Sequence, residues 1–240
     1  MYGSRARMGL IVPPTNTVME SEFHRMAPEG VSVHVARPDW DTPDPRPEAM
    51  LRLSGGVVHA ARRVALAGVQ IIIWGCTSGS FLKGLGYDRE MAREIEEATG
   101  VEGLTTSTAV IEALGELGLR RIAVATPYVD EVNEREVEFL AGHGFEVTEI
   151  KGLGIIDPLG IGRLTPSVAY DLAKEVDSPG AEGVFISCTD LRTIDVIGRL
   201  EEELGKPVIS SSQASMWAAL NRVGVMDVID GFGCLLARRY

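Results

Sequence analysis

The chain carries the same short motif twice, and each copy contains a cysteine followed by threonine. One copy spans residues 71–78 (IIIWGCTS) and the other residues 183–190 (GVFISCTD). In both, an apolar run of strand length leads to the cysteine, Cys76 or Cys188. Open α/β sheets carry their ligand chemistry at the carboxyl ends of strands. The repeat therefore predicts a cleft with one thiol on each wall.

Strand and helix patterns alternate along the whole chain, which constrains the fold further. With helices between them, strands are expected over residues 8–12, 31–35, 69–74, 121–125, 146–150, 183–187 and 206–209. Such alternation is typical of a mostly parallel sheet. A Ser/Thr-rich turn follows the first motif at residues 105–108, and a similar turn follows the second at 210–213. We predict an α/β fold of two pseudo-symmetric lobes, each a mostly parallel sheet flanked by helices, with the active site in the cleft between them.

The repeat also suggests where the lobes divide. Residues 1–117 together with 213–240 are expected to form the first lobe, and residues 118–212 the second. Helical spacing over residues 48–67 is interrupted by Gly55 and Gly56. The stretch 37–47 is rich in Pro and Asp, so it is expected to be a loop, placed over a site.

Composition argues against several classes of function. The formal net charge of −11 disfavours nucleic-acid binding, which needs clustered Lys and Arg. Three cysteines without a CxxC pair disfavour a disulfide framework or structural zinc and favour a reducing cytoplasm. No apolar run approaches the ~20 residues that span a bilayer, and the four histidines lack metal-ligand spacing. We therefore expect a cytoplasmic protein with no metal, no cofactor, no membrane and no nucleic-acid partner.

The two cysteines have a structural and a functional interpretation. Free cysteine is among the residues most often buried in cores, so either one alone could be structural. Their equivalent positions favour function, because one thiolate can act as base or nucleophile while an opposite thiol returns a proton. Hydroxyls after each cysteine, in Thr77, Ser78 and Thr189, either cap helices or bind a carboxylate. Cys234 lacks such a setting and is interpreted as structural.

Five segments carry a family resemblance: LIVPPTNT at 10–17, GCTS at 75–78, ATPY at 125–128, SCT at 187–189 and PVISS at 207–211. Together they resemble the aspartate/glutamate/hydantoin racemase superfamily. Within it, they are closest to the branch of maleate cis–trans isomerase, arylmalonate decarboxylase and the ectoine-utilisation homologues. The resemblance implies a cofactor-independent enzyme that binds a small carboxylate between two lobes. Members are often oligomers, so a homo-oligomer is consistent with it.

The resemblance also implies roles for individual residues. In maleate isomerases, the cysteine matching Cys76 attacks the double bond, rotation follows, and the one matching Cys188 assists as acid or base. The residue matching Asn16 binds a substrate carboxylate, and the one matching Tyr128 contacts the substrate. In two-base racemases the same cysteines exchange a Cα proton. The remaining predicted substrate-binding residues are Pro14, Thr77, Ser78 and Thr189.

Two departures bear on the substrate. Arylmalonate decarboxylases resemble residues 128–134 and the serines at 210–212, but they have glycine where this chain has Cys76. That cysteine therefore counts against a dedicated decarboxylase. Maleate isomerases carry a substrate-binding Asn where this chain has Pro158, which offers neither an amide side chain nor an N–H group. The loss of that contact favours a larger or less charged substrate than maleate.

The leading hypothesis is a cofactor-independent two-cysteine isomerase of a small carboxylate, of the maleate cis–trans isomerase type. A racemase of an amino acid or related α-substituted acid is the first alternative, and an arylmalonate decarboxylase-like enzyme is the second. A ligand-binding protein that kept the fold without catalysis is the alternative outside the enzymes. Low reactivity of both thiols would favour that alternative, because a working base must be accessible and prone to ionise.

Overall fold

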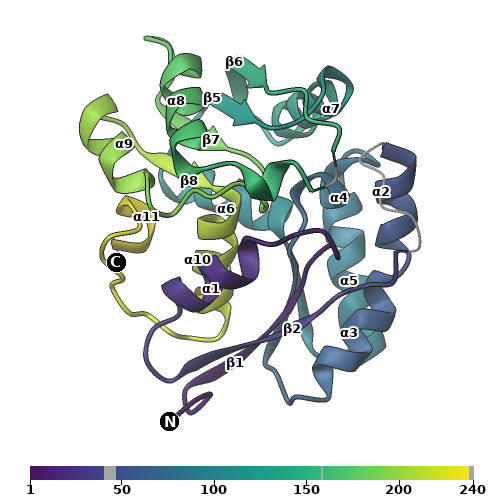
Figure 1. Cartoon of the computed structure of the whole chain (residues 1–240). Helices are drawn as coiled ribbons and strands as arrows, with labels where there is room; N and C mark the ends of the chain where they lie inside the picture. Colours follow the sequence, from purple (N-terminus) through teal and green to yellow (C-terminus); the bar gives the residue numbers. More distant parts are fainter. Residues whose placement is uncertain (41–46, 158, 238–240) are drawn as a thin grey trace.

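Two four-stranded parallel sheets form the framework of the molecule (Figure 1). The computed structural model describes residues 1–40, 47–157 and 159–237. The first sheet has the order β2-β1-β3-β4, made of β1 (Ala6–Ile11), β2 (Val31–Ala36), β3 (Ile71–Trp74) and β4 (Glu102–Thr105). The second has the order β6-β5-β7-β8, made of β5 (Arg121–Thr126), β6 (Glu146–Gly152), β7 (Gly183–Ile186) and β8 (Val208–Ser210). The identical order confirms the prediction of two pseudo-symmetric α/β lobes.

The strands that precede the two cysteines occupy equivalent central places. Strand β3 pairs with β1 and β4, and β7 pairs with β5 and β8, all in parallel. A central parallel strand is covered on both faces, which explains why both apolar runs are continuous. Every residue of β3 and β7 is buried. Both cysteines follow the last strand residue by two positions, so they emerge at corresponding carboxyl edges.

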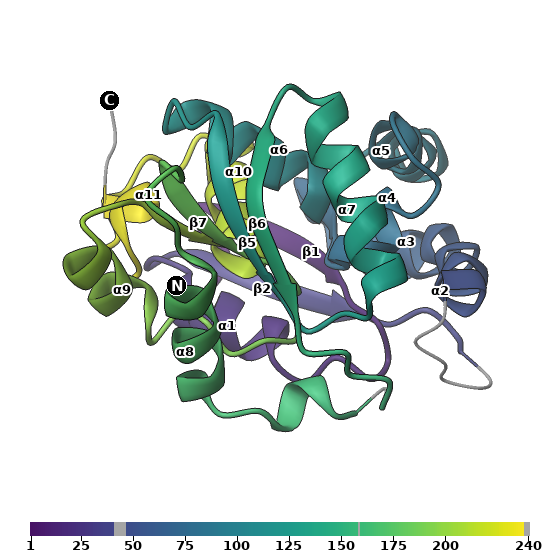
Figure 2. The same cartoon turned by 90° about the horizontal axis from the view of Figure 1, so that it is seen from above.

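Helices cover both sheets. Around the first sheet lie α1 (Met19–Met26), α2 (Pro47–Ser54), α3 (Val57–Ala65) and α5 (Tyr87–Thr99). The second is flanked by α7 (Asp130–Gly142), α8 (Pro166–Val176) and α9 (Ile197–Leu204), and Figure 2 views this layer from above. Short helical turns complete the described chain: α4 (Thr77–Phe81), a 3-10 turn (Ile161–Arg163) and α11 (Cys234–Ala237).

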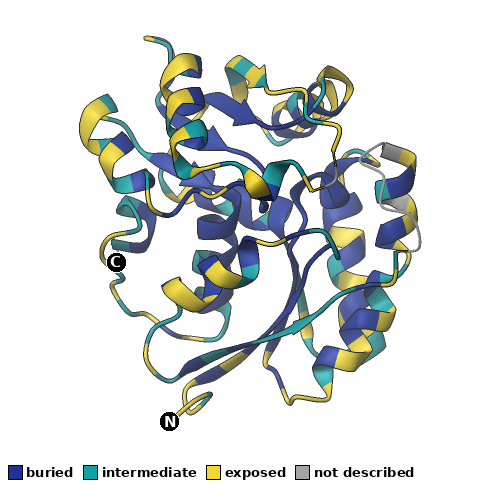
Figure 3. Cartoon of the chain, viewed as in Figure 1, coloured by how far each residue is buried: buried dark blue, intermediate teal, exposed yellow. Residues whose placement is uncertain are grey.

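Two helices join the lobes through their middle. Helix α6 (Thr106–Glu116) follows the last strand of the first sheet, and α10 (Ser211–Arg222) follows the last strand of the second. Side chains of α10 join the apolar cluster of the first sheet, whereas α6 packs mainly in a cluster with β5 and β7. Figure 3 shows the interior between the sheets as mostly buried, with exposed residues on the outer helix faces and the connecting loops. The lobe boundaries at 117/118 and 212/213 stay our proposal, because both helices contact both sheets.

Element by element, the structure matches most of the expected pattern. The break at Gly55 and Gly56 separates α2 from α3, as predicted. Strand β4 was missed, because its sequence Glu-Gly-Leu-Thr holds one large apolar residue and its strand form comes from pairing with β3. Helix α4 was also missed, since five residues are too few for a periodic pattern. Of the predicted loop, residues 37–40 are irregular, and residues 41–46 lie outside the described residues.

A close backbone contact gives a testable prediction for stability. Helix α5 packs so tightly on β4 that a Cβ at Gly103 would lie 2.1 Å from the carbonyl oxygen of Ala92. Gly103→Ala is therefore expected to lower the free energy of unfolding by about 3 kcal/mol or more. The matched control is Gly115→Ala in α6, where a Cβ meets nothing within 4 Å. The Gly115→Ala change is expected to raise the free energy of unfolding by about 0.5–1 kcal/mol.

Urea denaturation followed by circular dichroism measures both changes. Equal stability of the Gly103→Ala variant and the parent protein would mean that α5 can move away from β4 without loss of packing.

Candidate active site

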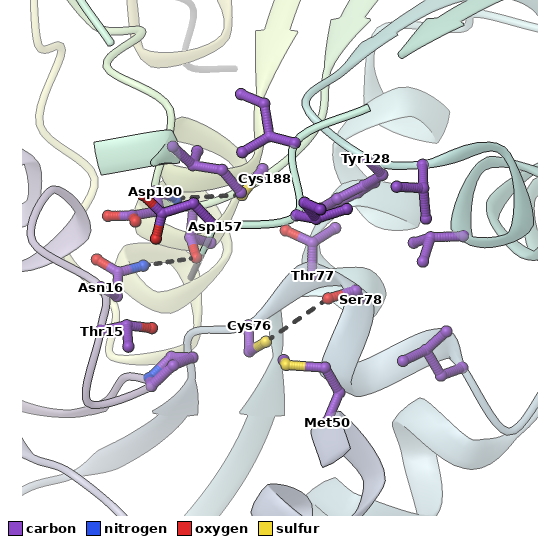
Figure 4. Close-up of a pocket in the computed structure, with 18 of the residues that line it drawn as sticks. Thr15, Asn16, Met50, Cys76, Thr77, Ser78, Tyr128, Asp157, Cys188 and Asp190 are labelled. Carbon is purple, nitrogen blue, oxygen red and sulfur yellow. Dashed lines mark hydrogen bonds between the residues drawn. The ribbon is translucent and has the colours of Figure 1, made fainter. Parts of the chain in front are cut away.

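A pocket of about 150 Å³ lies between the two sheets and receives side chains from both (Figure 4). Cys76 reaches it from the loop after β3, and Cys188 from the loop after β7. Both thiols are nearly buried, with exposed fractions of 5% and 8%. Two thiols from equivalent strand ends therefore line one pocket.

Cys76 sits at the N-cap position of α4. Its extended backbone turns the side chain back over the first helical turn, and Sγ accepts a hydrogen bond of 3.3 Å from the N–H of Gly79. The hydroxyl of Ser78 lies 4.0 Å from the same sulfur. Burial raises the pKa of the Cys76 thiol to about 11, although the Gly79 N–H and the Ser78 hydroxyl pull it down. The free site therefore holds Cys76 mainly as a thiol at neutral pH.

Cys188 has a strained backbone. Its φ of 92° makes it the one non-glycine residue with positive φ in the described part of the chain. Such conformations are costly, and they persist where surrounding contacts impose them. Here the Cys188 N–H donates to the hydroxyl of Ser211 at 3.1 Å, and the Asp190 N–H donates to Sγ at 3.4 Å. Burial raises the pKa of the Cys188 thiol, and the nearby Asp190 carboxylate raises it further, so this cysteine is held as the neutral thiol at neutral pH and keeps its proton until the reaction takes it.

Asn16 is oriented by the start of the first helix. Its carbonyl oxygen accepts the N–H groups of Val18 and Met19 at 3.1 and 3.0 Å. The amide nitrogen is thereby directed toward Thr189, whose hydroxyl accepts from it at 3.0 Å and donates to the carbonyl of Gly75 at 3.0 Å. One amide hydrogen then remains for a ligand. The side chain links the two lobes and presents a neutral donor to the pocket.

A second hydrogen-bonded chain joins the lobes behind the thiols. The hydroxyl of Thr77 donates to that of Ser211 at 2.9 Å, the same oxygen that receives the Cys188 N–H. Ser80 faces away from the pocket and donates to the carbonyls of Cys76 and Thr77 at 2.8 and 2.9 Å. The cap of α4 is thus the thiol of Cys76 and not a hydroxyl, while the hydroxyl of Thr77 helps to join the lobes. Binding of a carboxylate by these hydroxyls stays a prediction.

Asp190 ties two loops together at the edge of the pocket. Its carboxylate accepts the N–H of Thr17 at 2.8 Å, and it also interacts with the N–H groups of Val18 and Gly162. A Cβ at Gly162 would lie 2.3 Å from the Thr17 hydroxyl and 3.0 Å from both carboxylate oxygens, so this approach requires glycine. Burial raises the pKa of Asp190 to about 6, and the three N–H groups limit the rise. The carboxylate is thus held by the backbone beside Cys188.

Tyr128 closes the pocket from the second lobe. It follows β5 by two residues, and its N–H donates to the hydroxyl of Thr126 at 3.2 Å. The ring is 8% exposed and packs in the apolar cluster that contains Cys188. Burial raises the pKa of the Tyr128 phenol well above its usual range, so it is a neutral donor across the physiological range.

The lining of the pocket is mixed in character. It combines the thiols, hydroxyls and the Asn16 amide with the apolar side chains of Met50, Leu82, Val129, Val132, Ile155, Ile156 and Ile161. None of the described residues that line it is Lys or Arg, whereas Glu131, Asp157 and Asp190 are acidic. The site thus offers neutral donors to one anionic group and apolar surface to the rest of a ligand.

The structure brings most of the predicted site residues to this pocket. They are Asn16, Cys76, Thr77, Ser78, Tyr128, Cys188 and Thr189. Pro14 is not among the described lining residues. Its neighbours Pro13 and Thr15 line the pocket instead, and the Pro14 carbonyl accepts from Arg37 at 3.4 Å. Pro158 lies outside the described residues, so the loss of a carboxylate contact there stays a prediction.

Several lining residues were not predicted. Asp190 directly follows the second Cys-Thr pair, so its position in the motif was an available signal. Trp40 comes from the loop expected over a site. The apolar residues of the 150s had no signal, because Ile156 is 72% exposed and its place at the pocket depends on how the segment after β6 turns back.

In the described ranges, no group of three or more His, Cys, Asp and Glu side chains is arranged to hold a metal ion. No helix in those ranges is both long and apolar enough to cross a bilayer.

Comparisons with known proteins agree with this geometry. The family model for arylmalonate decarboxylase matches residues 8–236. The arylmalonate decarboxylase of Bordetella bronchiseptica is 33% identical over 223 residues, which cover 92% of each chain. A maleate isomerase of Pseudomonas putida is 27% identical over 247 residues, covering 98% of each chain.

A solved structure extends the likeness to the fold. A variant of the maleate isomerase Iso from Pseudomonas putida, crystallised with maleate, superposes with a TM-score of 0.92 at 26% identity, covering 97% of each chain. The resemblance inferred from the sequence motifs is confirmed. The match over nearly the whole length and the two-sheet architecture lead to one conclusion: the chain belongs to the arylmalonate decarboxylase family.

Proposed function

We propose that this chain is a cofactor-independent isomerase that acts on a small carboxylate with two thiols. The observation that carries the proposal is the placement of Cys76 and Cys188, from equivalent strand ends of two sheets, in one nearly buried pocket. Neutral donors surround them, and the relatives include maleate isomerases. The substrate carboxylate would accept hydrogen bonds from Asn16, Ser78 and Tyr128, since the hydroxyl of Thr77 already donates to Ser211.

The reaction follows from the two thiols and their different settings. Cys76, as its thiolate, adds to one carbon of the double bond, and the electron pair moves to the other carbon and its carboxylate. The Cys188 thiol donates its proton there, which leaves a thioether to Cys76 and a carbon–carbon single bond. After rotation, the Cys188 thiolate removes that proton and Cys76 departs as thiolate, so that no atom is gained or lost.

The pocket favours a substrate with an apolar part. A dianion such as maleate would face acidic residues without a basic side chain among the described lining residues. Burial of unpaired charge is costly, so one carboxylate with an apolar substituent suits the walls better. This supports a second candidate, racemisation of an α-substituted acid with a single carboxylate. Chemistry on arylmalonates, which carry two carboxylates, is supported separately by the 33% identity to an arylmalonate decarboxylase. In racemisation the same thiols would exchange a Cα proton.

Proton NMR in D2O distinguishes these reactions. The purified protein is incubated with maleate, with phenylmalonate, and with enantiopure α-substituted acids. Conversion of maleate to fumarate is the result expected for the isomerase. Deuterium at Cα without loss of a carboxylate would identify a racemase, and release of phenylacetate would identify a decarboxylase. Inert substrates throughout the panel would contradict an enzyme of this kind.

We also propose a cytoplasmic homo-oligomer. The three free cysteines support a reducing compartment, and the oligomer rests on the superfamily resemblance. Light scattering after size-exclusion chromatography measures the mass in solution.

A further inference from the structure

A buried carboxyl group lies behind Cys188 and has no part in the proposed reaction. Glu136 projects from α7 with an exposed fraction of 1%. One of its oxygens accepts a hydrogen bond of 2.6 Å from the hydroxyl of Ser187, the residue that precedes Cys188. The other oxygen is buried and has no hydrogen-bond partner within the described residues. A buried glutamate with one carboxyl oxygen left without a hydrogen bond is unusual and points to a role beyond packing.

The surroundings of Glu136 keep it uncharged. Its helix packs into an apolar cluster through Val132 and Phe139, which are one turn away on either side. No Lys or Arg in the described part of the chain forms an ion pair with it. An ionised carboxylate without a partner is expensive to bury. Burial accordingly raises the pKa of Glu136 to about 8, against a smaller opposing effect of the Ser187 hydroxyl.

Contacts lead from Glu136 to the thiol through two hydroxyl groups. The side chains of Ser187 and Tyr128 interact, and Tyr128 interacts in turn with the Cys188 thiol. Figure 4 shows the Tyr128 ring beside Cys188 at the same end of the pocket. Negative charge on Glu136 acts on Tyr128 directly and raises its pKa. A charge on this carboxyl group is thus felt at Tyr128, the side chain that interacts with the Cys188 thiol.

Few titratable groups share these surroundings. Tyr128 after β5 is acted on by charge at Glu136, Cys188 and Cys76, while α4 itself holds no charged residue. Strand β6 offers Lys151, which is half-exposed and paired with Glu175 of α8. The other charged side chains of β6 and α8 are exposed: Glu146, Glu149, Asp171 and Lys174. Asp190, after β7, raises the pKa of Cys188, and its own pKa of about 6 means that it ionises at lower pH. Above that pH, Glu136 is the buried carboxyl group near the thiol whose charge still changes.

We propose that Glu136 is a positioning residue that must stay uncharged for Cys188 to ionise, and that it acts through Ser187 and Tyr128. As a neutral acid it leaves the Tyr128 hydroxyl free to donate to the Cys188 thiolate that forms after proton transfer. As a carboxylate it opposes that thiolate and any anionic substrate beside it. The expected effect of Glu136 on turnover rests on the proposed function. The expected effect of Glu136 on the ionisation of Cys188 does not.

The test compares Glu136→Gln, which is neutral at every pH, with the parent protein. The matched control is Glu138→Gln, an exposed position on the same helix. Alkylation of Cys188 by iodoacetamide is followed from pH 6 to 10 by peptide mass spectrometry, and turnover is followed over the same range. In the parent protein and the control, the rise of both rates should flatten above pH 8. In Glu136→Gln the ratio of the rates at pH 9.5 and pH 7 should be about tenfold larger, equivalent to about one pKa unit at the thiol.

The two readouts separate this inference from the proposed function. Identical alkylation ratios in Glu136→Gln and the parent protein would overturn the inference, whatever the turnover shows. A larger alkylation ratio, in a protein that turns over no carboxylate, would support the inference while contradicting the proposed function. If Glu136→Gln fails to fold, Glu136→Leu tests the same point, because its apolar side chain suits the cluster around α7, and the same ratio is expected.

Discussion

Replacement of Cys188 by alanine is expected to lower turnover by about a thousandfold or more, the upper range for loss of a general acid–base group. In the proposed reaction no other group donates the proton to the carbanion. The nearest alternatives are Tyr128 and Asp190, and neither fits. Tyr128 is placed to donate a hydrogen bond to the Cys188 thiolate, and the carboxylate of Asp190 is occupied by backbone N–H groups. The measurement is the initial rate on the acid that the NMR panel identifies.

The fold should survive this change. Alanine and cysteine tolerate the φ of 92° equally poorly, so the strain at this position is left as it was. Cys234→Ala is the matched control, because this third cysteine is only half-buried and does not line the pocket. If the Cys188→Ala variant retains more than about one tenth of the parent rate, Cys188 is not the general acid–base group of the reaction.

Replacement of Cys76 by alanine is expected to lower turnover by about ten-thousandfold or more, because it deletes the nucleophile on which every later step depends.

The turnover of the parent enzyme should also depend on pH in the way that the high pKa of this thiol requires. Because this pKa is about 11, the thiolate fraction increases about tenfold with each unit by which the pH rises, up to that value. Turnover should therefore increase from pH 6 toward pH 8, before Glu136 ionises.

The thiol can be titrated without a substrate. In a protein carrying Cys188→Ala and Cys234→Ala, only Cys76 remains to react with iodoacetamide. Its alkylation rate should still be rising at pH 10, because the pKa of the buried thiol lies near 11. A plateau already reached at pH 8 would show that the Gly79 N–H and the Ser78 hydroxyl outweigh burial, and that Cys76 is thiolate-prone before substrate binds.

Features that depend on a short stretch of sequence could be predicted, and features that depend on pairing with distant residues could not. The two Cys-Thr motifs follow continuous apolar runs, and such runs report strands buried on both faces, so the central strands and their cysteines were predictable. Glu136 carried a signal that was overlooked. It falls on the apolar spacing of its helix, between Val132 and Phe139, where a charged residue is unexpected. Strand β4 carried none, because its pairing with β3 is what makes it a strand.

By itself, the sequence determined the repeated α/β architecture, the family and the pair of cysteines, since all three follow from short patterns along the chain. Only the tertiary structure decided how the site is assembled. Asn16 meets Thr189, and Thr17 meets Asp190, across 173 residues of chain, and Thr77 meets Ser211 across 134. The left-handed turn at Cys188 and the close approach at Gly162 also arise there. The physical reason is that hydrogen bonds between loops of different lobes form only after both sheets have packed against α6 and α10, and no local pattern encodes that meeting.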